Sequence, residues 1–132
     1  MNVRFFPLFC LPVLCAAILV SCHPVSRVDA ALNDVESYIN DAPDSARRVL
    51  VSVDSTSLRT KRLRARYSLL RIMAQDKCYD DITIPGLLDD AAWFEHHGTP
   101  DERMKLWFYR GCIQLELNDE NEAALAFSRA EA

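Results

Sequence analysis

The chain is poor in glycine and proline, with 3 and 6 of these residues among 132. So little of either residue excludes a collagen-like or a low-complexity disordered chain. Hydrophobic residues make up 50% of the sequence and charged residues 26%, which is typical of a folded globular protein. The length predicts one small domain.

An excess of positive charge is also missing, since 15 lysines and arginines face 19 acidic residues for a net charge of -4. Nucleic-acid binding through phosphate contacts depends on such an excess, so we expect no nucleic-acid partner. The 3 histidines and 5 cysteines are scattered, without the paired short spacings of a zinc site. No nucleophile motif is recognisable either. We therefore expect no catalytic residues, no metal and no cofactor.

The first 21 residues differ from the rest. Arg4 precedes an uncharged apolar run over residues 5–20, and polar sequence follows at once. This run contains Pro7 and Pro12 and is shorter than the roughly 20 residues that a membrane-spanning helix needs. The pattern predicts a cleaved export signal over residues 1–21.

The sequence Leu19-Val20-Ser21-Cys22 ends this leader. It resembles the lipobox of bacterial lipoproteins. The resemblance implies that the Cys22 thiol receives a diacylglycerol, that a peptidase cleaves just before it, and that the new amino terminus carries a further acyl chain such as palmitate. Two or three acyl chains anchor a protein stably, whereas one binds only marginally. Residues 22–26 would then be a lipidated tether in the cell envelope, facing the periplasm; the alternative is an ordinary secretory signal with a coincidental cysteine.

The remaining chain is predicted to be all-α, because apolar residues recur at three- and four-residue spacings and no strict alternation indicates strands. Asp44 and Ser57 are expected to cap the second and third helices, and Gly98 to end the fourth in a left-handed conformation. Trp93 or Phe94 is expected to face inward. The expected helices cover about 26–39, 44–53, 57–76, 85–98, 100–117 and 120–132.

The last two helices carry a recurring set of small and aromatic residues: Trp107, Gly111, Ala123, Phe127 and Ala130. This set is similar to the signature of the tetratricopeptide repeat (TPR), a 34-residue helix-turn-helix unit. Arg110 and Gln114 depart from it, since the family usually has leucine and tyrosine there. The resemblance is best over residues 104–132 and implies that residues 27–132 form helix-turn-helix pairs stacked as a short TPR-like α-solenoid.

In TPR proteins the first helix of each pair lines a groove that binds extended peptides or partner helices. The resemblance places Lys105, Phe108, Cys112 and Leu115 on that groove, together with Arg64 and Arg71 from the third helix. Two guanidinium groups beside an apolar patch could bind a carboxylate or an acidic segment of a partner. The alternative is that the apolar residues are plain core and the arginines a solvated flank.

Two other charged groups have simpler interpretations. The basic residues between 59 and 71 do not share one helical face, since Arg59, Arg62 and Arg66 lie on one side of the apolar stripe and Lys61, Arg64 and Arg71 on the other. His96 and His97 are adjacent at a helix end, where they point apart and favour the helix dipole, so we do not expect a metal site with Glu95 and Asp101. We also expect no disulfide between Cys78 and Cys112.

The sequence thus predicts a lipid-anchored, extracytoplasmic protein-protein interaction module without catalysis. The alternative is a ligand-sensing or carbohydrate-binding component of an uptake or signalling system. Leu125 and Phe127 of the last helix are expected to lie uncovered, which suggests a following repeat or self-association through that end.

Overall fold

The computed structural model describes residues 24–132, with side chains described from Arg27 onward. The expected signal peptide over residues 1–21 and the expected lipid attachment at Cys22 lie outside this range. All regular structure between residues 24 and 132 is helical, as the sequence predicts. No helix in this part of the chain is long and apolar enough to cross a membrane. The elements are α2 (Pro24–Tyr38), α3 (Pro43–Val51), the 3-10 turn η1 (Ser55–Ser57), α4 (Lys61–Lys77), α5 (Leu87–Ala91), α6 (Phe94–His97), α7 (Pro100–Glu116) and α8 (Glu120–Glu131).

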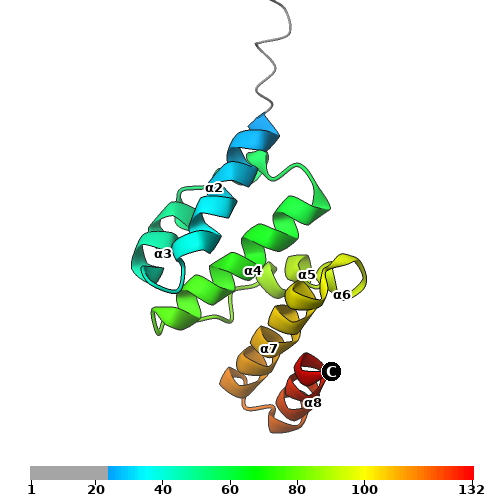
Figure 1. Ribbon diagram of the computed structural model, residues 1–132. Helices are drawn as coiled ribbons and strands as arrows, with labels where there is room; N and C mark the ends of the chain where they lie inside the picture. Colours follow the sequence, from blue (N-terminus) through cyan, green and yellow to red (C-terminus); the bar gives the residue numbers. More distant parts are fainter. Residues whose placement is uncertain (1–23) are drawn as a thin grey trace, which may run out of the picture.

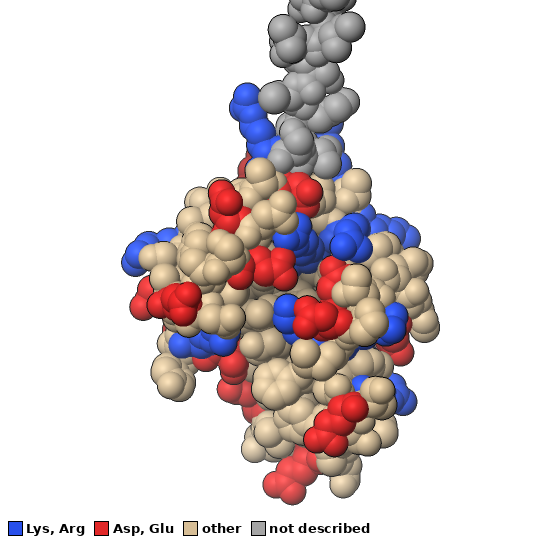
Figure 2. All heavy atoms as spheres, in the orientation of Figure 1, with Lys and Arg blue, Asp and Glu red and all other residues tan. Residues whose placement is uncertain are grey.

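Helix α4 is the centre of the molecule, and it contacts α2, α3, α5 and α7 (Figure 1). Helix α7 packs against α6 and α4 on one side and pairs closely with α8. Figure 1 shows α7 and α8 at the end of the molecule away from the first residues of α2. On the face shown in Figure 2, basic side chains gather mainly over the half nearer to α2, and the lower half is largely uncharged, with some acidic and a few basic side chains.

The core follows the helical spacing that the sequence predicts. Helix α2 buries one face through Leu32, Val35 and Ile39, and α3 buries Ala46 and Leu50. Helix α4 is buried on most of its surface because helices cover it on several sides. Burying such apolar side chains supplies the main force that holds the helices together.

The two C-terminal helices begin and end close to where they are expected. The Thr99 hydroxyl accepts from the Glu102 amide nitrogen at 3.2 Å, and the Thr99 amide donates to the Glu102 carboxylate at 2.8 Å. This reciprocal capping box, followed by Pro100, fixes the start of α7. Asn118 has a positive φ of 60° in the turn, and the Asp119 side chain then caps α8.

Three expected helix ends are wrong. Ala42, not Asp44, is the residue before α3, because Pro43 occupies the first helical position. Thr60 caps α4, while Ser57 belongs to η1. Gly98 has an extended backbone, with φ -82° and ψ 160°, and not the expected left-handed conformation. Glycine is needed there because a β-carbon would lie 2.7 Å from the Phe94 carbonyl oxygen.

The expected fourth helix is divided. Helix α5 starts after Gly86, which has a positive φ of 84°, and a turn at Ala92 and Trp93 separates it from α6. Phe94 is fully buried, whereas Trp93 is half-buried. The break therefore directs Phe94 into the core and leaves the Trp93 ring at the surface.

Candidate functional site

Helices α7 and α8 approach closely at Gly111. A β-carbon at Gly111 would lie 2.5 Å from Cε1 of the Phe127 ring, so only glycine leaves room for the ring. Ala123 is buried and Ala130 is half-buried in the same pair. Of the two residues expected to lie uncovered, Leu125 is 47% exposed, whereas Phe127 is half-buried because one part of its ring packs over Gly111.

Trp107, the remaining residue of the repeat signature, has two guanidinium groups over its ring. The Arg110 and Arg129 guanidinium carbons lie 4.7 and 4.5 Å from the ring centre, within cation-π distance. Arg110 also faces Glu95, with a nitrogen-oxygen distance of 3.8 Å. These contacts join the outer flank of α7 to α8 and α6.

Three of the predicted groove residues form an exposed apolar stripe along one flank of α7. Phe108 is 43% exposed, Leu115 is 50% exposed, and Cys112 between them is half-buried. The ring centres of Phe108 and Phe127 are 5.8 Å apart, so α8 extends this surface. We call Phe108, Cys112, Leu115 and Phe127 the apolar stripe. An exposed row of large apolar side chains is typical of a binding surface.

Acidic groups border the apolar stripe. Burial and the Asp76 carboxylate of α4 raise the pKa of the Cys112 thiol, and Glu116 adds a smaller effect in the same direction. Burial, with Asp76 contributing, also raises the pKa of Tyr109 to about 12. Cys112 is therefore a protonated, weakly reactive thiol at neutral pH, and the charge near the stripe is negative.

A cluster of ion pairs lies around Lys105, at the end of the predicted groove nearer to the start of α7. The carboxylate of Glu36 on α2 binds Arg66 of α4 at 2.7 Å and lies 3.7 Å from Lys105 of α7. Arg66 also binds Asp29 at 2.9 Å and Lys105 binds Asp101 at 2.7 Å. Lys105 is thus engaged within the protein, and Arg66 is the arginine beside it.

The two predicted groove arginines do not join this surface. Arg64 donates to the Leu58 carbonyl at 3.1 Å and lines a hollow formed with α5, away from Lys105. Arg71 binds the Tyr67 hydroxyl at 3.3 Å. Arg64 and Arg71 thus contact other neighbours than the residues of the apolar stripe. The predicted division of the basic residues into two flanks does agree with the structure, because Arg66 and Arg64 contact different neighbours.

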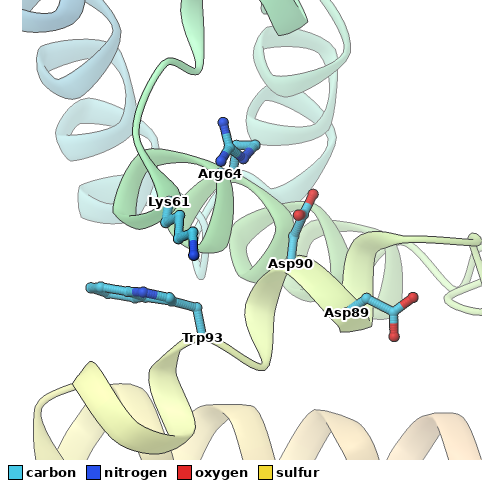
Figure 3. Close-up of a pocket in the computed structure, with 5 residues that line it drawn as sticks. All are labelled: Lys61, Arg64, Asp89, Asp90 and Trp93. Carbon is cyan, nitrogen blue, oxygen red and sulfur yellow. The ribbon is translucent and has the colours of Figure 1, made fainter.

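The hollow beside Arg64 has a volume of about 310 Å³. It lies between α4 and the segment from α5 to Trp93, and Figure 3 shows the lining side chains. These are Lys61, Arg64, Asp89, Asp90 and Trp93. The sequence pattern does not indicate this group of residues. The four-residue step from Asp89 to Trp93 was visible, but the pairing of α4 with α5 across the intervening loop was not.

His97 has a structural role. The His97 ring stacks on the Trp93 ring, with centres 4.5 Å apart and planes 7° apart, and its Nδ1 lies 3.1 Å from the Trp93 carbonyl oxygen. No group of three potential metal ligands occurs between residues 24 and 132. Cys78 and Cys112 both carry free thiols.

Comparisons of the chain with protein-family models, with curated proteins and with solved structures find no match.

Proposed function

We propose that this chain is a lipid-anchored, non-catalytic protein-binding module of the cell envelope, facing the periplasm, with its helix pairs forming a short TPR-like solenoid. The apolar stripe is the observation that carries the proposal. Exposed aromatic and aliphatic side chains on the flank of a well-packed helix are what a protein partner needs for affinity.

The order of contacts supports the stacking of pairs. Helices α2, α4 and α7 contact one another in succession, while α3 packs against α4 and α6 against α7. Each pair thus contacts mainly its neighbour along the chain, as expected in a solenoid. The close approach at Gly111 provides the small-residue contact on which the resemblance to TPR proteins rests.

The partner that fits the apolar stripe best is an amphipathic helix of another protein. Its apolar side chains would cover Phe108 and Leu115, and lysine or arginine at its edge would face Asp76 and Glu116. A basic edge replaces the acidic segment predicted from the sequence, because Arg64 and Arg71 lie elsewhere.

Placement relative to the membrane is consistent with this role. The first described residues of α2 follow the proposed anchor, and α7 and α8 lie at the other end of the molecule (Figure 1). A partner helix would therefore bind away from the lipid surface.

The anchor is tested by intact mass and membrane fractionation of the full-length protein beside a Cys22→Ala variant. We expect the wild type to be membrane-bound, with the mass of the acylated chain that starts at Cys22, and the variant to be released from the membrane. A wild type that keeps its leader and stays soluble would overturn the anchor.

The partner site is tested with a photo-crosslinking residue at Leu115 in the anchored protein, with Val51 of α3 as the matched control. Val51 is 61% exposed and lies outside the apolar stripe. We expect a discrete adduct from position 115 only, and its loss when Phe108→Ser is added. Equal adducts from both positions, or an adduct with the mass of two copies of this chain, would contradict the proposed partner.

A further inference from the structure

The hollow between α4 and α5 contains charges of both signs that do not pair with each other. Lys61 and Arg64 come from α4, and Asp89 and Asp90 come from α5. None of these four side chains forms an ion pair with any residue that the structure describes. Other charged residues of α4, such as Arg62 and Arg66, do form ion pairs. Basic and acidic side chains therefore line the same hollow without neutralising each other through ion pairs.

The arrangement of the lining atoms is directional. In Figure 3 the Lys61 side chain points toward Trp93, the Asp90 carboxylate points toward Arg64, and Asp89 points away from the other labelled side chains. Arg64 is held by its bond to the Leu58 carbonyl at 3.1 Å, which leaves its other guanidinium nitrogens free to donate. Cationic donors and an anionic acceptor therefore border the same space.

The aromatic wall is fixed in place. Trp93 stacks on His97 and meets the buried Phe94 ring edge-on, with ring centres 5.7 Å apart. A positioned indole face offers an apolar surface for an aliphatic or planar group. A volume of about 310 Å³ is at the lower end of the range for small-molecule sites.

We infer that this hollow binds a small zwitterion of the amino-acid or short-peptide type. The ligand carboxylate is bound by Arg64 and Lys61, its ammonium group by Asp90, and its side chain lies against Trp93. A ligand with both charges pairs with the basic residues of α4 and with Asp90 of α5 at the same time. A singly charged ligand leaves one of these two sets without a partner. This small-molecule site adds to the proposed protein-binding function and does not depend on it.

The test uses the fluorescence of Trp93 in the full-length chain. The chain has only 2 tryptophans, so Trp107→Phe leaves Trp93 as the single indole, and Trp107 does not line the hollow. The probes are L-leucine and leucyl-leucine, with N-acetyl-L-leucine lacking the ammonium, L-leucinamide lacking the carboxylate, and glucose lacking both. We expect saturable binding of at least one zwitterion, and binding of each singly charged analogue to be weaker by about tenfold or more.

Two variants test which residue binds each charged group of the ligand. Asp90→Asn is expected to weaken the zwitterion and L-leucinamide but not N-acetyl-L-leucine, and Arg64→Gln to weaken the zwitterion and N-acetyl-L-leucine but not L-leucinamide. Asp34→Asn and Arg59→Gln change exposed charges outside the hollow and should leave binding unchanged. Absence of saturation at millimolar probe, equal binding of glucose, or equal losses in the control variants would overturn the site.

Discussion

The Phe127 ring lies directly over Gly111, with Cζ only 2.7 Å from the place that a β-carbon would occupy. One hydrogen atom in place of a methyl group thus determines how closely α8 can approach α7. Because α8 packs mainly against α7, this contact holds the last helix of the chain in position.

Replacing that glycine tests the contact. Gly111→Ala should lower the free energy of unfolding by about 1–3 kcal/mol, since the Phe127 ring must move. In a Phe127→Ala background the same change should be neutral or stabilising, because alanine favours a helix by up to about 1 kcal/mol over glycine. Urea unfolding followed by circular dichroism measures both differences, and an equal cost in the two backgrounds would argue against the ring contact.

The start of α7 offers a second prediction. Thr99→Ala removes the acceptor for the Glu102 amide and should cost about 1 kcal/mol of stability. Thr99→Ser keeps the hydroxyl and should retain most of it. Thermal unfolding of the wild type and the two variants measures these differences. A serine variant as unstable as the alanine variant would exclude capping as the cause.

The ion pairs of Glu36 should contribute modestly to the free energy of unfolding. Glu36→Gln removes the charge shared by Arg66 and Lys105, and the expected cost is under about 1 kcal/mol because the carboxylate is partly exposed. Salt screens such pairs, so the difference from wild type should shrink at about 1 M salt. Urea unfolding at low and high salt tests this, with Glu116→Gln as an exposed control; a cost that salt does not change would point to packing instead.

Tyr109 makes the stability depend on alkaline pH. Its pKa is about 12 in the folded protein and about 10 in an unfolded chain. Between these values the unfolded state loses the phenol proton and the folded state keeps it, so the free energy of unfolding falls as pH rises from about 10 to about 12. Urea unfolding at about pH 9 and about pH 11 should show a smaller fall for Tyr109→Phe than for wild type. An equal fall in both would assign the pH dependence to other groups.

The sequence predicted the helices well where local signals agree. For α7, Pro100, the acidic first turn and the apolar spacing all indicate one helix, and its start and end lie within a residue of expectation. Before α3 and α4, several polar residues could serve as the helix cap. Thr60 caps α4 because Ser57 belongs to η1, and no local sequence rule predicts that 3-10 turn.

The candidate sites could be predicted only in part for a related reason. The stripe on α7 follows from helical periodicity alone, because all but Phe127 of its residues lie on a single helix. The hollow depends on how α4 faces α5, and that orientation is set by packing between segments distant in sequence. The sequence pattern thus placed Arg64 on the predicted groove instead of beside Asp90 and Trp93.

The position of α2 has a mechanical consequence. If Cys22 fixes the chain to a lipid surface as proposed, any pull between the membrane and a bound partner enters the fold through α2. That helix is joined to α3 and α4 by its buried face and, through Glu36, to Arg66. Force would therefore spread first into the central helix, and the pair of α7 and α8, at the far end, would bear the load only through its contacts with α4 and α6.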